Sequence, residues 1–541
     1  ALPSTPTEIT VAYAERFPAE TQAIFVGRGF DGVKRVIEGL KSVIPAELFQ
    51  VAFFEAEVRN TFGLDVNRPV TFREAGIYYD GGFALGDVMQ QPVFAVMLLD
   101  PEVFAAKVRD VLRANPFNMR ARVETVEAGD ATVELYRARE GDEPDLALVI
   151  DGTMGYLISR TTTSRSLSEV ALALVGVEAG NSLSTNQAFG EVLAKFDEFP
   201  GFLYINSREA LSYYRQRFDD QMSNPTKFIF DHVAAAVTGV GAGFRWDGQS
   251  IVAHGFVRVS DEVLAIAQGI DQPEGENPHF ERAIGEGSYL ALRLSLNPRV
   301  LWSTAMAFQG MPTTLPGAEA PEYHVPEDAA ERVAADVQDA LRFLGDEAVE
   351  ELNSVLTGQV AVTLNRLSFL TLVQASDLTD YADGTWATLA FQVRDREAAI
   401  RLLDRTVQAY PDRLSRQDEG DVARYVVRDQ SLNYGDIAVI QDLIVVGSDR
   451  RLRTIIRRAG ESELNPLESP NPLVADVVTG TRGAGGFLTF SQLAPLANIP
   501  AVPRIARDIL EILGSAAFTA EMRDDGVYIR GRLELNPAPQ E

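Results

Sequence analysis

The chain has 541 residues, a net charge of −28 at pH 7, an apolar fraction of 46% and no cysteine. The lack of cysteine excludes disulfide scaffolds, cysteine-ligated zinc, iron–sulfur clusters and thiol nucleophiles. An acidic surface repels nucleic acids, so we expect no nucleic-acid partner. Apolar runs such as Val93–Leu99 are far shorter than the roughly 18 residues of a membrane-spanning helix. We therefore expect no transmembrane segment in this chain.

The first residues predict a polar, proline-bearing tether over residues 1–10. Residue 1 is alanine, which removal of a signal peptide would explain, with a trimmed chain as the alternative. Arginine greatly outnumbers lysine among the basic residues, a usage typical of a bacterium with a GC-rich genome. We therefore expect an extracytoplasmic location, in the periplasm or on the cell surface of a bacterium. A lipid anchor upstream of Ala1 is compatible with this interpretation.

A glycine-rich run, Gly27–Gly32, follows the strand-like segment Ala23–Val26 and precedes an apolar-striped helix at Val33–Ile44. This order is that of a dinucleotide-binding fingerprint. The matching segment later in the chain has no glycine and uses Asn297 to cap its helix before Pro298. We therefore expect Asp31 to be a helix cap as well, and we predict no nucleotide and no other cofactor.

Five segments recur in the same order along the chain, beginning with a strand that ends on an aspartate and runs into a helix. Phe94–Asp100 precedes a helix at Pro101–Val108, and Leu389–Asp395 precedes one at Arg396–Leu403. Asp100 and Asp395 are each placed to cap the helix that follows. The other pairs are hairpins, helices or strands: Leu146–Ser159 with Asp436–Ser448, the helices that follow at Ser166–Leu174 and Arg450–Arg458, Phe202–Ser207 with Phe487–Gln492, and Gly243–Val259 with Ala520–Leu535.

The ordered recurrence predicts an internal duplication. The fold class that we expect is α+β, with two tandem copies of an antiparallel sheet and helices packed on one face. The expected boundaries are residues 11–267 for the first unit, 268–288 for a polar join and 289–541 for the second unit. The segments Gly81–Met89 and Gly310–Pro326 have no evident counterpart, so we expect them to hold features specific to this protein.

The motif Gly63-Leu64-Asp65, followed by Phe72–Ile77, resembles a signature of a duplicated bacterial exported or lipoprotein family of unknown function. The strand–helix junctions at Asp395 and at Ser448-Asp449 resemble the same family. The resemblance implies a location in the cell envelope. It implies no defined activity and therefore no catalytic residues.

Candidate metal ligands are few, and they lack ligand spacing. His279 and His324 lie in acidic segments beside Glu274, Glu276, Glu281, Glu322 and Glu327, so a divalent metal would fit if these segments met. His232 and His254 are expected on a helix and in a strand, as packed or surface residues. Asp377, Asp380 and Asp383-Gly384 lack the alternating ligands of a calcium loop and favour a solvated turn.

No nucleophile elbow and no phosphate-binding loop occurs, so we predict no catalytic residue. The arginine-rich run at 449–458 is expected to form the solvated face of a helix, with Leu452, Ile455 and Ile456 turned inward.

We expect a non-enzymatic exported envelope protein that acts as a binding or scaffold component, with envelope proteins or an apolar ligand as its partner. A carrier of an apolar ligand or lipid, and a carboxylate-based hydrolase of envelope polymers, are the alternatives.

Overall fold

The computed structural model describes residues 2–43, 63–114, 122–137, 143–160, 166–177, 180–218, 237–260, 280–284, 288–295, 351, 354–365, 387–428, 435–459, 471–480, 483–490 and 512–536. Within these residues, 20 strands form one sheet, and every strand pair is antiparallel. The predicted join at 268–288 and the segment Gly310–Pro326 lie wholly or largely outside the described residues.

The strands of the first half are β1 (Ala23–Gly27), β2 (Phe83–Val88), β3 (Gln91–Met97), β4 (Arg122–Ala128), β5 (Ala131–Arg137), β6 (Leu146–Asp151), β7 (Met154–Ser159), β8 (Gly201–Ile205), β9 (Val237–Asp247) and β10 (Ser250–Val259). Those of the second half are β11 (Leu290–Ser295), β12 (Leu356–Leu364), β13 (Ala387–Val393), β14 (Leu414–Glu419), β15 (Val422–Val427), β16 (Asp436–Ile440), β17 (Leu443–Gly447), β18 (Ala484–Thr489), β19 (Leu513–Arg523) and β20 (Gly526–Leu535).

The helices are α1 (Pro6–Ala14), α2 (Phe30–Val43), α4 (Pro69–Glu74), α5 (Pro101–Ala114), α6 (Leu167–Val175), α7 (Gln187–Leu193), α8 (Ser207–Phe218), α11 (Phe280–Ala283), α17 (Arg396–Ala409), α18 (Asp449–Ala459) and α19 (Pro472–Thr479). Helix α1 begins inside the stretch expected to be a tether. A capping box between Thr5 and Glu8 starts this helix, and its residues Ile9 and Tyr13 are buried. Residues 6–10 are therefore part of the folded protein.

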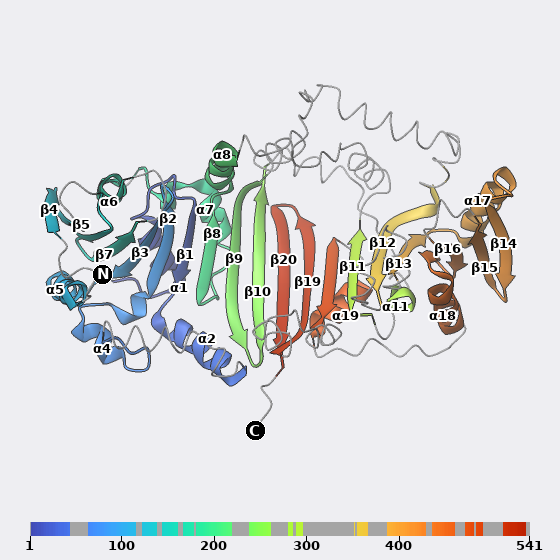
Figure 1. Ribbon diagram of the computed structural model, residues 1–541, viewed down its shortest axis with the longest axis horizontal. Coiled ribbons are helices and arrows are strands. Elements are labelled where there is room, and N and C mark those ends of the chain that lie inside the picture. The colour runs from blue at the N-terminus through green and yellow to red at the C-terminus, as the bar shows by residue number, and fades with distance from the viewer. Residues whose placement is uncertain are drawn as a thin grey trace.

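The strand order across the sheet is β4-β5-β6-β7-β3-β2-β1-β8-β9-β10 in the first half and, read from the far edge, β14-β15-β16-β17-β13-β12-β11-β18-β19-β20 in the second. Each strand therefore occupies the same position in its half as the strand ten places later in the chain. The two halves lie side by side along one extended sheet (Figure 1).

The expectation of two separate sheets is wrong, because β10 pairs with β20 from Ser250↔Glu534 to Val257↔Val527. Without this pairing, each strand would end its own sheet and leave a row of backbone donors and acceptors unpaired. Pairing the two edges satisfies these groups and produces one continuous sheet.

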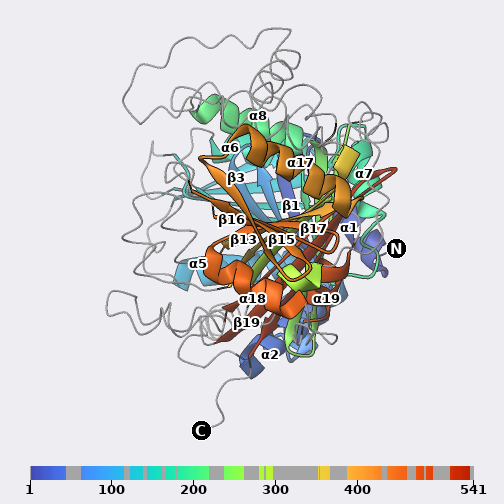
Figure 2. The same ribbon diagram turned by 90° about the vertical axis from the view of Figure 1, so that its right-hand side faces the viewer.

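Helices pack on both faces of the sheet rather than on one. Face A, which carries Val26 of β1 and Ala390 of β13, is covered by α1, α6 and α7 in the first half and by α11, α18 and α19 in the second. Face B, which carries Phe25 and Phe391, is covered by α4 and α5 and by α17. Helices are seen on both sides of the strands in the end-on view of Figure 2.

The sequence of β3 explains why one helical layer is insufficient. Val93 and Ala95 are buried on face A, whereas Val96 is buried on face B and Phe94 is partly buried there. A strand that is apolar on both sides needs cover on both sides. The expectation of helices on one face is therefore corrected to a sheet between two incomplete helical layers.

The helix caps predicted at Asp100 and Asp395 are confirmed. Asp395 caps α17 by accepting from the amides of Glu397 and Ala398, and Asp100 accepts from the amide of Val103 at the start of α5. The segment Gly81–Met89, in contrast, does have a counterpart. It contains β2, which lies between β1 and β3 as β12 lies between β11 and β13.

Candidate functional site

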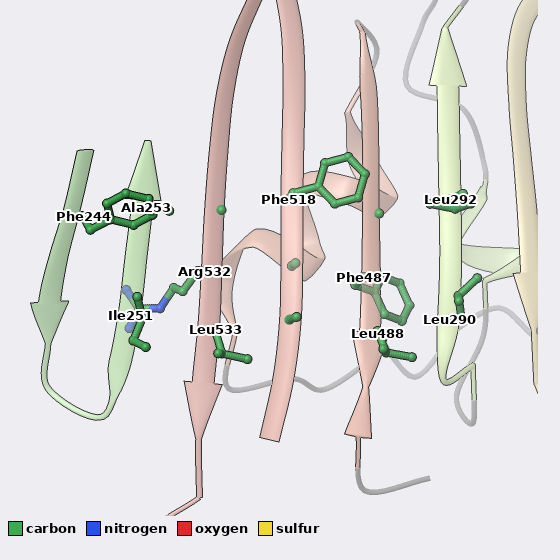
Figure 3. Close-up of a pocket in the computed structure, with 14 residues that line it drawn as sticks. Phe244, Ile251, Ala253, Leu290, Leu292, Phe487, Leu488, Phe518, Arg532 and Leu533 are labelled. Carbon is green, nitrogen blue, oxygen red and sulfur yellow. The ribbon is translucent and has the colours of Figure 1, made fainter. Parts of the chain in front are cut away.

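The candidate site is an apolar groove on face B, across the six strands at the middle of the sheet. One row of paired residues crosses these strands in the order Phe244, Ala253, Gly531, Phe518, Gly486 and Leu292. A second row crosses them in the order Trp246, Ile251, Leu533, Ala516, Leu488 and Leu290. All of these residues except Trp246 line a groove of about 420 Å³ (Figure 3).

Small residues hollow the groove. Between the rings of Phe244 and Phe518, the row passes through Ala253 and Gly531, which offer at most a methyl group (Figure 3). A Cβ atom added at Gly531 would meet nothing closer than 3.8 Å, so the space above this residue is open. At Gly486, by contrast, an added Cβ would lie 2.6 Å from Leu292 and 2.8 Å from Phe518, whose side chains already cover it.

The groove is open to one side. Phe244 is 36% exposed, Phe518 39%, Leu292 42% and Leu294 40%, which is unusual for large apolar side chains that share one sheet face. Among the described residues, α7 and α19, which pack on the central strands, both contact face A. Helix α2 borders the groove at β9, where its Gly39 contacts the Trp246 ring.

The groove offers a ligand almost no polar group. Each of its six strands has a neighbour on both sides, so their backbone donors and acceptors are used within the sheet. Among the described residues, Arg532 is the one charged residue that lines it, and its guanidinium binds Asp247 at 2.9 Å and Glu534 at 2.5 Å. The site therefore suits apolar contact rather than strand addition or acid–base chemistry.

The histidines expected as metal candidates are not brought together in the described structure. His254 lies in β10, half-buried on face A, with its ring 4.9 Å from the ring of Phe199. His232, His279 and His324 lie outside the described residues, as do Asp377, Asp380 and Asp383. Within the described part of the chain, no group of three or more histidine, aspartate or glutamate residues is placed to hold a metal ion.

The glycine-rich run has a structural role. Strand β1 ends at Gly27, Gly29 has φ +88°, and α2 begins at Phe30. Asp31 lies inside the first turn of the helix and accepts from the Tyr79 hydroxyl at 2.9 Å, so the expectation that it caps the helix is wrong. Its counterpart at Asn297-Pro298 lies outside the described residues.

The arginine-rich run is not uniformly solvated. Leu452 and Ile455 of α18 are buried as expected, and Ile456 is partly buried. Arg451, however, is also buried, and it donates to the hydroxyl of Thr388 and the carbonyl oxygen of Ala283. This arginine holds α18 against β13 and α11, so it is no part of a nucleic-acid surface.

The hydrolase alternative needs two free carboxylates in a polar groove. Asp476 and Glu521 both line a polar cleft on face A. Asp476 is paired with Arg530 at 3.3 Å, and Glu521 with Arg523 at 3.0 Å. Each of these carboxylates is paired with an arginine, so the cleft gives no support to the acid and nucleophile pair of a glycosidase.

The described helices include none long and apolar enough to cross a membrane. The chain matches no protein-family model and no curated protein. Among solved structures, it is similar to crystal forms I, III and IV of TP0453, at 12%, 10% and 11% identity and TM-scores of 0.24, 0.24 and 0.26. The similarity covers 50%, 49% and 48% of this chain and 82%, 82% and 92% of those chains. Values this low assign neither a family nor a function.

Sequence reasoning missed the groove because it depends on the strand register. Phe244, Gly531 and Leu292 are far apart in the chain and become neighbours only through long-range pairing. One feature of the sequence does indicate it. Strands β11 and β20 carry apolar residues at alternate positions, which predicts one apolar face, and no helix was predicted to pack on that face.

Proposed function

We propose that this protein is a non-enzymatic binding protein that holds an apolar ligand, the acyl chain of a lipid, in the groove on face B. The observation that carries the proposal is the apolar lining of the groove in an otherwise acidic protein. Arg532, the one charged residue among the described lining residues, is already engaged by Asp247 and Glu534. A ligand with hydrogen-bonding groups along its length would lose hydration there without finding partners. An acyl chain has no hydrogen bonds to water to lose along its length, and its burial in the groove is favourable.

Size favours a small ligand over a protein partner. Six strands with a spacing near 4.8 Å and about four residues of each strand cover roughly 400 Å². A specific protein interface needs about 800 Å² on each partner. The groove volume of about 420 Å³ falls in the range typical of small-molecule sites, roughly 300–1,000 Å³. A scaffold that docks proteins through this face alone is therefore the less supported alternative.

We also infer that the two halves are copies of one duplicated unit, because the ten strands of each half share one order. The duplication gives the site its position, since the groove lies across the strands where the two units meet. The bacterial envelope is the compartment that we propose. The arginine-rich composition supports it.

The test is binding of a fluorescent fatty acid to the purified full chain and to Gly531→Leu. The leucine has room, because nothing lies within 3.8 Å of the position of its Cβ, and its side chain would fill the groove. If the leucine removes about 100 Å² of apolar contact with the ligand, the binding free energy becomes less favourable by roughly 2.5 kcal/mol. We therefore expect affinity to fall by about 50-fold or more.

Gly190→Leu is the matched control, because this glycine is exposed on α7 and an added Cβ would contact nothing within 4 Å. We expect this variant to bind like the wild type. The proposal fails if the wild-type chain does not bind the fatty acid, or if Gly531→Leu binds it as tightly as the wild type does.

A further inference from the structure

A second cavity lies on face A, directly behind the groove. It is a polar cleft of about 640 Å³, with a floor formed by β10, β20 and β19. Lys195, just after α7, lines one side, and Asp476 and Thr479 of α19 line the other. His254 and Arg530, which face each other across the strand pair that joins the halves, lie in its floor.

The charge of this cleft is opposite to that of the protein. Among the described residues, the cationic side chains that line it are Lys195, Arg293, Arg523 and Arg530, against the carboxylates of Asp476 and Glu521. Lys195 is also paired with Asp525 at 2.7 Å, so the positive charges still exceed the negative ones by one. In the whole chain, acids outnumber bases by 77 to 49. A local reversal of charge in a concave, partly enclosed surface concentrates anions there.

The ion pairs in the cleft are of the kind that exchanges easily. The side chains of Arg530 and Asp476 are 57% and 48% exposed, and those of Arg523 and Glu521 are 55% and 39% exposed. Exposed pairs of this kind contribute little stability, so an incoming anion can replace the carboxylate at low cost. A guanidinium group also binds oxyanions through two parallel hydrogen bonds.

Aromatic rings position two of these cations. The guanidinium carbon of Arg523 lies 4.5 Å from the centre of the Tyr528 ring. The Lys195 ammonium lies 5.4 Å from the centre of the Phe256 ring, and the Phe256 and Tyr528 rings are 4.9 Å apart. Cation–ring contacts restrict where the charges point, and an ion pair with Asp525 at 2.7 Å fixes Lys195 further. The cleft is therefore preorganised for an anion from several strands at once.

We propose that this cleft is a binding site for a small oxyanion, a phosphate or carboxylate group, held chiefly by Arg523 and Arg530. It is independent of the acyl ligand, because the groove lies on the other face of the same strands and is lined by different side chains. The two halves contribute jointly, since Lys195 and His254 come from the first and Arg523 and Arg530 from the second.

The experiment is isothermal titration calorimetry of the full chain with inorganic phosphate and, separately, with succinate, at fixed pH and ionic strength. The two probes distinguish a phosphate site from a carboxylate site. We expect saturable binding of at least one probe. Arg530→Gln and Arg523→Gln should each weaken it by about tenfold or more, because each removes a charge-assisted hydrogen-bond donor.

Glu521→Gln gives a result of opposite sign. It removes the carboxylate that competes for Arg523, so we expect tighter binding, which a general loss of structure would not produce. Arg137→Gln is the matched control for charge, because Arg137 pairs with Glu124 near the far edge of the sheet. The proposal is overturned if neither probe binds, or if both cleft arginine variants bind as tightly as the wild type.

Discussion

His254 of β10 lies directly opposite Arg530 of β20 in the strand pair that joins the two halves. The two residues occupy matching positions. Each lies four residues after the first residue of its strand, and that first residue follows the hairpin turn. Their side chains lie on face A, in the polar cleft, whereas the next pair, Gly255 and Ile529, belongs to apolar face B. One strand pair therefore separates a polar surface from an apolar one.

His254 should titrate below its ordinary pKa of 6.5. Burial lowers this pKa, the positive charges of Arg245 and Arg530 lower it further, and Glu198 opposes them. Because the folded pKa lies below the unfolded one, protonation favours the unfolded state. The stability that His254 contributes is present above about pH 6.5 and is lost as the pH falls toward the folded pKa.

Arg530→Gln should raise the pKa of His254, because one nearby positive charge is removed while the burial remains. Proton NMR titration of the histidine ring signals measures this, with His254→Asn identifying the signal. An unchanged or lower pKa in the arginine variant would contradict the predicted interaction across the strand pair.

Gly82→Ala should destabilise the fold far more than Gly152→Ala. Both glycines have positive φ, +62° and +56°, so each alanine bears a similar backbone cost of roughly 1–2 kcal/mol. At Gly82 the added Cβ would also overlap the carbonyl oxygen of Gly27, where β1 meets β2, whereas at Gly152 it would contact nothing within 4 Å. Thermal unfolding compares the two, and equal losses would show that the packing at Gly82 is misassigned.

Arg109→Met should destabilise the fold, because the buried carboxylate of Glu134 would lose the cation with which it pairs. Glu134 of β5 is 6% exposed, and it accepts from the Arg109 Nε at 2.8 Å and from the Tyr136 hydroxyl at 2.7 Å. Burial raises the pKa of Glu134, but these two donors lower it by more. Loss of the cation should lower the free energy of unfolding by about 2 kcal/mol. This is less than the roughly 3–5 kcal/mol that is usual for breaking a buried ion pair, because Arg109 is partly exposed.

The pH dependence of this loss follows from the sign of the shift. The folded pKa of Glu134 is lowered, so its stabilising effect is present above the unfolded value of about 4.3 and is lost as the pH falls through the folded pKa. Urea unfolding at pH 7 and pH 3 should show a larger difference between variant and wild type at pH 7 than at pH 3. Arg137→Met, which breaks an exposed pair with Glu124, should change stability by less than about 1 kcal/mol.

The parts of the fold that could be predicted depend on short stretches of chain. Asp100 and Asp395 could be assigned as caps because the cap and the amides that it binds are two or three residues apart. The hairpin of β9 and β10 could be predicted because Asp247-Gly248 is a strong tight-turn signal, and Gly248 does take φ +64°. The hairpin of β19 and β20 was also found, but its turn lies at Asp524-Asp525, and Gly526 is already in the strand.

The rest could not be predicted because it depends on long-range pairing. Nothing in the residues of β10 or β20 indicates that each is the other's neighbour rather than the edge of a separate sheet. The position of β2 was missed because Phe83–Val88 has no sequence likeness to its counterpart Leu356–Leu364, although both occupy the same place in their halves. The groove follows from this pairing, so it was missed too.

Native mass spectrometry of the full chain, purified from cells without delipidation, tests the central claim most directly. The wild-type protein should carry a bound molecule whose mass corresponds to a fatty acid or lipid. Gly531→Leu, with the groove filled, should lose it, and Gly190→Leu should retain it. A wild-type chain that carries no such molecule, or a groove-filled variant that carries it equally, would contradict an acyl-binding site on face B.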